Sequence, residues 1–311
     1  MESTYSAIST PPQIVAANMN AAKGKTELPL LRMILLGIFA GMFIAGGASA
    51  SSLAMHAISN VGLARLVAGS IFPVGLMMIV LVGGELFTGD CLMIMGCVHG
   101  KFSAVKMVKV LIVVYLANLA GSVLFAELVN LSGQYNYTNG LLGAFTIKVA
   151  LGKVNLSFGA ALASGILCNI FVCMAVLMAM AAKDIAGKVW AIFFPILAFV
   201  VSGYEHCVAN MYYVPAGIFA VGNAAYAQAA QEAYGYTAQQ LAQLTWGNFL
   251  VNNLIPVTLG NIVGGMFFVG IPLYLIHNHK LRAEEKTAEV PAAQPIALDV
   301  RPAAVQNSAE Q

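Results

Sequence analysis

Six long apolar segments alternate with short polar ones along the chain. They cover about residues 30–57, 66–97, 104–132, 157–182, 187–220 and 246–277. Crossing the roughly 30 Å hydrocarbon core of a bilayer takes about 20 apolar residues in a helix, and each segment reaches that length. The pattern therefore predicts six transmembrane helices.

Two of these segments are unusually long and are interrupted in the middle. GGELFTGDC (83–91) breaks the second segment, and SGYEHCVAN (202–210), with Glu205 and His206 side by side, breaks the fifth. A helix broken in lipid frees backbone N–H and C=O groups, each of which costs several kcal/mol unless protein or a wet cavity satisfies it. We therefore expect both breaks to face a pore or the protein interior. Ionisable residues at that depth favour a functional role, with a purely structural histidine as the alternative.

Matching segments in the two halves of the chain indicate an internal repeat. YLANLAGSVL (115–124) matches TLGNIVGGMF (258–267). LGIFAGMFIA (36–45) in the first span and GILCNIFVCM (165–174) in the fourth span occupy equivalent positions. The breaks also fall in the second segment of each half. Three spans per half, with both chain ends on one side, force the halves into opposite orientations. The pattern therefore predicts an inverted repeat with a transport path at its breaks.

Composition places the chain in the membrane class. Hydrophobic residues make up 59% of it and charged residues only 9%, whereas a typical soluble domain is about 25% charged. We predict an all-α integral membrane protein whose six-helix transmembrane domain covers 29–280, in halves of about 29–132 and 157–280. Residues 1–28 form a cytoplasmic N-terminal segment with a predicted short helix on the membrane surface. Residues 281–311, rich in Ala, Glu, Gln and Pro, are predicted to be a disordered cytoplasmic tail.

The distribution of Lys and Arg orients the six helices. Twelve of the fifteen lie on the side of the two termini, and the three on the other side are Arg65, Lys148 and Lys153. Because cytoplasmic loops are enriched in these residues, both termini are predicted to be cytoplasmic. The first helix is too long and starts too far into the chain to be a cleaved signal peptide. A prokaryotic inner membrane is the expected location, and we expect no nucleic-acid partner.

The five cysteines give no sign of a metal centre or cofactor. Their number is odd, all of them lie in apolar segments, and no paired CxxC spacing occurs. We interpret them as small packing residues, and we expect neither a metal nor a cofactor.

Three segments in the order of the chain resemble the signature segments of the formate–nitrite transporter family, which comprises formate, nitrite and hydrosulfide channels. They are GELFTGDCLMI (84–94), GYEHCVANMYYVPAGI (203–218) and NLIPVTLGNIVGG (253–265). The resemblance covers about residues 28–280. It implies an aquaporin-like protomer within a homopentamer, with one pore through each protomer.

The resemblance also implies roles for residues at and near the two breaks. It implies a threonine at the second-span break, a central histidine at the fifth-span break, hydrophobic constrictions, a basic vestibule residue and two pore-facing asparagines. These are Thr88, His206, the constriction Phe72, Leu76 and Phe199, the vestibule residue Lys153, and Asn169 and Asn261. Without the resemblance, the constriction residues would be taken for core or lipid-facing side chains, and Lys153 for an ordinary loop charge.

A mechanism follows from the cost of moving an anion through a dry constriction. A bare anion pays a large desolvation penalty that the neutral acid does not pay. We expect Lys153 to attract the anion and Thr88 to hydrogen-bond it. His206, whose unperturbed pKa lies near neutrality, would donate or relay a proton, or hold a charge that draws the anion in. Glu205 would orient and tune the break, or merely satisfy freed backbone N–H groups.

The predicted function is proton-linked passage of small monovalent anions of weak acids through a lipid bilayer, without enzymatic activity. Formate is the first choice, and nitrite, hydrosulfide, lactate and acetate are alternatives that the residues do not distinguish. A neutral-solute channel would share the repeat, but the Asn-Pro-Ala motif of aquaporins is absent from both breaks. An intramembrane hydrolase would have to pair Ser164 or Ser202 with His206.

Overall fold

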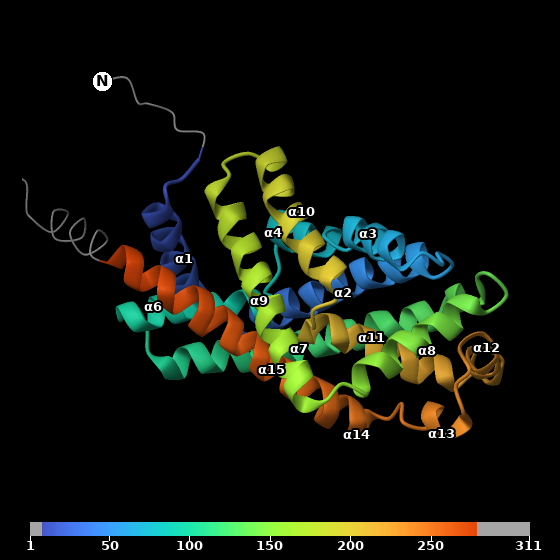
Figure 1. Cartoon of the computed structure of the whole chain (residues 1–311). Coiled ribbons are helices and arrows are strands. Elements are labelled where there is room, and N and C mark those ends of the chain that lie inside the picture. The colour runs from blue at the N-terminus through green and yellow to red at the C-terminus, as the bar shows by residue number, and fades with distance from the viewer. Residues whose placement is uncertain (1–7, 279–311) are drawn as a thin grey trace, which may run out of the picture.

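The computed structural model describes residues 8–278, and within that range the chain is almost entirely helical (Figure 1). Six helices are long and apolar enough to cross a bilayer, as the hydrophobic pattern predicted. They are Leu30–Met55, Val61–Val82, Ala104–Leu131, Phe158–Ala181, Ile185–Ser202 and Trp246–Asn278. Two shorter apolar helices, Phe87–His99 and Cys207–Val221, follow the second and fifth. The chain is therefore an integral membrane protein.

The two halves of the chain contain corresponding elements. The first half consists of α2 (Leu30–Met55), α3 (Val61–Ile71), α4 (Val74–Val82), α5 (Phe87–Asp90), η1 (Cys91–Met93), α6 (Ile94–His99) and α7 (Ala104–Leu131). The second consists of α9 (Phe158–Ala181), α10 (Ile185–Ser202), α11 (Cys207–Val221), α14 (Trp246–Asn248), η3 (Phe249–Leu254), α15 (Ile255–Ile262) and η4 (Val263–Gly270). In each half the first span packs along the last, α2 on α7 and α9 on α15.

Both predicted helix breaks are present, and each begins at a glycine. Gly83 ends α4 with φ of +112°, and Gly203 ends α10 with φ of +74°. Backbone with positive φ favours glycine, because a side chain would be strained there. The chain then runs extended to Leu86 and His206, the N-cap residues of α5 and α11, whose backbone angles are nearly the same (φ −111° and −109°).

Two helices lie where the sequence analysis expected loops. They are α8 (Leu141–Val154), between the two halves, and α12 (Ala224–Tyr234), before the last span. At 14 residues α8 is too short to cross a bilayer, so the length criterion passed over it. It is nevertheless apolar, and it packs against α11, which places its last turn beside the fifth-span break. The short elements η2 (Gln134–Asn136) and α13 (Ala238–Leu241) flank these helices.

The N-terminal segment forms a helix, but the helix packs on the protein. Helix α1 (Pro11–Thr26) buries Val15 and Met19 in a cluster with Leu92 of η1 and Leu177 of α9. We had expected it to lie on the membrane surface. Its apolar residues are instead covered by the end of the bundle, so α1 brings its last turn to the second-span break. The predicted disordered tail at 281–311 lies outside the described residues.

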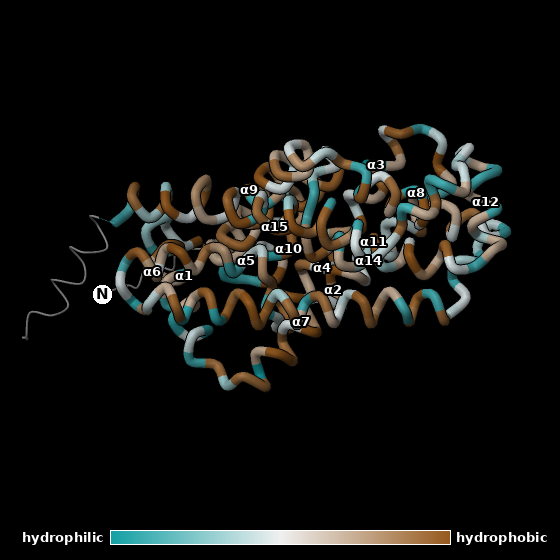
Figure 2. The backbone as a smooth tube through the Cα atoms, turned by 90° about the horizontal axis from the view of Figure 1, so that it is seen from below, coloured by the Kyte–Doolittle hydropathy of each residue, from teal (hydrophilic) through white to brown (hydrophobic). Residues whose placement is uncertain are grey.

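Hydrophobic residues cover the middle of the bundle, and hydrophilic residues gather toward its two ends. Figure 2 shows one hydrophilic end around α12 and the other around α1 and α6. Large apolar side chains such as Ile112, Phe194 and Phe267 are exposed along the outside of the described helices. This distribution is typical of a bundle whose sides face lipid.

Candidate functional site

An asparagine of α7 holds the break in the second span. The side-chain oxygen of Asn118 accepts a hydrogen bond from the Phe87 N–H (2.9 Å). Its amide nitrogen donates to the carbonyl groups of Gly37 and Glu85, both at 2.8 Å. Asn118 is fully buried, so it satisfies backbone groups that the break would otherwise leave unpaired in an apolar environment.

An asparagine of α15 holds the break in the fifth span in the same way. Asn261 accepts from the Cys207 N–H (2.9 Å) and donates to the carbonyl groups of Gly165 (2.8 Å) and Glu205 (3.0 Å). The two halves thus repeat one set of contacts, in which Gly37 corresponds to Gly165. That correspondence shifts the matched first-span segments by one residue from the alignment in the sequence analysis.

The two asparagines expected to face the pore are largely engaged in backbone contacts. The side chain of Asn261 is used entirely at the break. Asn169 donates to the carbonyl groups of Thr88 (3.2 Å) and Asn261 (2.6 Å). Its side-chain oxygen is buried and has no hydrogen-bond partner among the described residues. Asn169 therefore keeps one free acceptor next to Thr88, whereas Asn261 differs from the expectation because it holds the helix break.

The two breaks meet at a hydrogen bond between Thr88 and His206. The Thr88 Oγ1 and His206 Nε2 atoms are 2.8 Å apart, and both side chains are buried. The His206 Nδ1 accepts a hydrogen bond from the Ala209 N–H (3.0 Å), so His206 also caps the N-terminus of α11. An Nδ1 that accepts from a backbone N–H carries no proton, which assigns the ring as the neutral tautomer with its hydrogen on Nε2. That hydrogen points to the Thr88 hydroxyl.

Three apolar side chains close the space on either side of this hydrogen bond. Phe72 and Phe199 meet edge to face with ring centroids 5.6 Å apart, and Phe199 stacks 6.1 Å from the His206 ring. Leu76 lies one turn after Phe72 along the second span. All three side chains of the predicted constriction are buried, with 2–3% of their surface exposed.

Two cavities lie on opposite sides of the constriction. The Lys153 cavity, of about 260 Å³, is lined by Lys153, Glu205, His206, Phe72 and Phe199 among others. The Lys25 cavity, of about 450 Å³, is lined by Lys25, Glu85, Asp90 and Leu76 among others. The three apolar side chains are thus divided between the linings of two cavities, each of which also contains a lysine paired with a glutamate.

In the Lys153 cavity the lysine is paired with Glu205. The Lys153 Nζ lies 2.9 and 3.1 Å from the two carboxylate oxygens of Glu205. Glu205 also accepts from the side-chain amides of Asn210 (2.6 Å) and Asn253 (3.5 Å). The Glu205 side chain therefore anchors the break to α8 and the last span. Its carboxylate accepts only from side chains among the described residues. Glu205 therefore does not satisfy freed backbone N–H groups, which was one of the two roles considered for it.

Removing the lysine alone should destabilise the protein more than removing the whole ion pair. In Lys153→Met the Glu205 carboxylate stays buried with only amide partners, and breaking a buried pair from one side costs about 3–5 kcal/mol. The double variant Lys153→Met/Glu205→Gln leaves no buried charge. In detergent, we expect the thermal unfolding midpoint of Lys153→Met to lie several degrees below that of the double variant. Equal midpoints for the two variants would contradict this.

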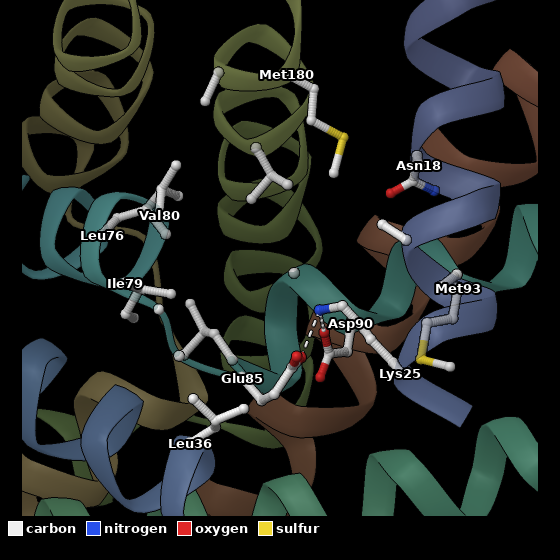
Figure 3. A pocket seen from close by; sticks show the side chains of 18 of the residues that line it. Asn18, Lys25, Leu36, Leu76, Ile79, Val80, Glu85, Asp90, Met93 and Met180 are labelled. Carbon is white, nitrogen blue, oxygen red and sulfur yellow. Dashed lines mark hydrogen bonds and ion pairs between the residues drawn. The ribbon is translucent and has the colours of Figure 1, made fainter. Parts of the chain in front are cut away.

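The Lys25 cavity contains the corresponding arrangement, which the sequence analysis missed. The Lys25 Nζ lies 2.5 Å from a carboxylate oxygen of Glu85 and 2.5 Å from one of Asp90 (Figure 3). Burial alone would lower the pKa of Lys25, but the two carboxylates outweigh it, so the pKa is raised and the lysine stays charged. Two buried acids at a helix break require a nearby cation. That requirement was the available signal, but the cation comes from a distant part of the chain.

Among the described residues, no serine forms a nucleophilic pair with His206. The Ser164 hydroxyl accepts from the Glu205 N–H (3.0 Å), and Ser202 is exposed. Both His206 nitrogens are engaged, by Thr88 and by Ala209. Within residues 8–278 there is also no cluster of His, Cys, Asp and Glu that could hold a metal ion.

Comparisons with known proteins agree with the resemblance. A family model described as formate/nitrite transporter matches residues 12–275. The chain is 36% identical to a probable formate transporter of Methanothermobacter thermautotrophicus, over 85% of this chain and 95% of that protein. It is 37% identical to the formate channel FocA of Escherichia coli K12, over 70% of this chain and 75% of that one. It superposes on a solved pentameric formate channel with formate bound, with TM-score 0.71, 35% identity and coverage of 80% of this chain and 98% of that chain.

Proposed function

Because the chain belongs to the formate/nitrite transporter family, whose model matches residues 12–275, we propose that it conducts small monovalent anions of weak acids across a membrane. The family consists of channels and transporters, so the chain is not an enzyme. Formate is the first choice of substrate, because the similar proteins described above are named for it. Nitrite, hydrosulfide, lactate and acetate are the alternatives.

The arrangement of the protein in the membrane is part of the proposal. The pentameric state of the solved formate channel supports a homopentamer with one path through each protomer. The excess of Lys and Arg on the side of the termini supports cytoplasmic termini. The similar proteins of Methanothermobacter thermautotrophicus and Escherichia coli support a prokaryotic inner membrane. The Lys153 cavity then opens to the outside and the Lys25 cavity to the cytoplasm.

The observation that carries the proposal is the buried Thr88–His206 hydrogen bond between the two cavities. An anion that leaves the Lys153 cavity must pass the rings of Phe72 and Phe199 and shed its water. The cost of desolvating a bare anion there is large, and the neutral acid avoids it. Loss of water also raises the pKa of a weak acid, since desolvation disfavours its charged form. The proton therefore joins the anion at the constriction.

His206 acts in its neutral form. A cationic ring would need a proton on Nδ1, which would displace the Ala209 N–H and remove the cap of α11. Neutral His206 presents its Nε2 hydrogen to the Thr88 hydroxyl, and that hydroxyl can donate its own hydrogen to the passing oxygen atom. The Thr88–His206 pair thus donates a hydrogen bond to the substrate. The proton that joins the anion comes from solvent, because a proton given up by Nε2 would leave an imidazolate whose Nδ1 is held by the Ala209 N–H. Of the roles considered at this point of the path, a hydrogen bond to the substrate through Thr88 is favoured over a proton donated by the His206 ring and over a fixed positive charge.

Uptake of labelled formate into proteoliposomes tests the substrate class. We expect uptake above that of empty liposomes, with competition by nitrite or hydrosulfide and none by glycerol. Uptake of glycerol without formate uptake would instead favour a neutral-solute channel. Absence of uptake for every one of these anions would refute the proposal.

A further inference from the structure

The Lys153 cavity contains a second cation, Arg65 of α3, which lines it together with Lys153 and His206. Its guanidinium makes one hydrogen bond, from Nη1 to the Val201 carbonyl (3.2 Å). Over residues 8–278 no carboxylate forms an ion pair with Arg65, whereas Lys153 is bound to Glu205. Because Lys153 and Glu205 are paired, the net positive charge among the residues that line this cavity comes from Arg65.

We propose that Arg65, rather than Lys153, captures the anion at the mouth of the path and selects its shape. This inference rests on the proposed function and concerns the same site. A planar guanidinium binds two oxygen atoms at once through parallel N–H donors. Arg65 is exposed, and toward residues 8–278 only one of its five N–H donors is committed. It suits carboxylates and nitrite, which present two oxygens, better than hydrosulfide, which presents a single sulfur.

A purely structural role for Arg65 is the competing interpretation. Val201 lies in the last turn of α10, where carbonyl groups lack helical partners, and a cation there stabilises the helix end. The two roles differ in what they need. Capping needs an N–H donor, which glutamine also has, whereas capture of an anion needs the positive charge. Charge in an exposed cavity is also screened by salt.

The experiment measures initial uptake of labelled formate at low formate concentration, in low and in high salt, for the full-length protein in liposomes. We expect Arg65→Gln to reduce uptake about fivefold in low salt and to approach the wild type in high salt, since steering by a charge is lost to screening. Lys148→Gln is the matched control. Lys148 is another cation of the same side, and it lies over the Tyr234 ring rather than in the cavity. We expect Lys148→Gln to take up formate like the wild type at both salt concentrations.

A cysteine variant tests the charge at position 65, because the charge is changed by a reagent after the protein has folded. We expect a trimethylammonium methanethiosulfonate to restore uptake by Arg65→Cys, and the sulfonate-bearing reagent to lower it further. The wild type treated with the same reagents is the control, since its five cysteines are buried or half-buried. Arg65→Lys should keep the salt-dependent uptake but lose preference for formate over hydrosulfide.

Three results would overturn the inference. The first is an Arg65→Gln variant with wild-type uptake at both salt concentrations. The second is an Arg65→Gln variant whose loss of uptake is the same at both salt concentrations. The third is an equal effect of the two reagents on uptake by Arg65→Cys. Failure of the proposed function is a separate result, because the wild type itself would then show no formate uptake.

Discussion

His206→Asn should fold like the wild type and take up formate about a hundredfold more slowly, the effect of removing one well-placed donor from a buried site. Asparagine is a good N-cap residue, so its side-chain oxygen can replace Nδ1 as the acceptor for the Ala209 N–H. Its side chain is too short to replace Nε2 beside Thr88. The variant therefore separates the capping role of His206 from its contact with Thr88.

The measurement is labelled formate uptake with and without an inward proton gradient, alongside thermal unfolding. We expect the wild type to respond to the gradient, and His206→Asn to keep the unfolding midpoint while losing the response. His206→Ala serves as the comparison, because it removes the cap as well and should also unfold at a lower temperature. An Asn variant with wild-type, gradient-dependent uptake would exclude the proposed role of His206.

Asn261→Leu should be the most destabilising single substitution at the breaks. It leaves the Cys207 N–H and the Glu205 carbonyl buried without partners, and each unsatisfied group costs about 1–3 kcal/mol. It also removes the bond that ties the break to the Gly165 carbonyl of α9, which keeps its helical hydrogen bond. Asn118→Leu should have a similar effect, because Asn118 makes the corresponding three bonds in the first half. Asn252→Leu is the control, since Asn252 is an exposed asparagine of the same last span.

Thermal unfolding in detergent and the yield of folded protein measure this effect. We expect both break variants to unfold at least 10 °C lower than the wild type, about what a loss of several kcal/mol gives in a protein of this size. Asn252→Leu should unfold like the wild type. Break variants that match the Asn252→Leu control would show that the breaks do not depend on these asparagines.

The spans and breaks were predictable because their causes are local. The apolar segments and the glycines Gly83 and Gly203 act through length, hydropathy and backbone angles that the sequence displays directly. The contact between Thr88 and His206 could be anticipated from the repeat, which places the two breaks at corresponding points.

The partners of the charged groups were not predictable in this way. Lys25 lies 60 residues from Glu85 and 65 from Asp90, and no local pattern connects them. Helix α8 was missed because it is too short to span a bilayer. It nevertheless carries the lysine that neutralises Glu205. Long-range pairing of this kind depends on packing, which the hydrophobic pattern does not contain.

The Asn261 assignment differed from the structure for a related reason. An intramembrane amide is expected to face a water-filled path, since burial of a polar group is costly. Backbone groups of the break and of the neighbouring helix α9 use all the bonds that Asn261 makes. Sequence alone does not distinguish an asparagine that meets a solute from one that meets backbone.

The anion is expected to pass the Thr88–His206 pair together with a proton. The most direct measurement records labelled formate uptake and internal pH at the same time, in proteoliposomes carrying a trapped pH indicator, with empty liposomes subtracted. We predict internal acidification that matches formate uptake one to one, without a change in membrane potential. Formate uptake that is electrogenic and leaves the internal pH unchanged would mean that the bare anion crosses, which contradicts passage together with a proton.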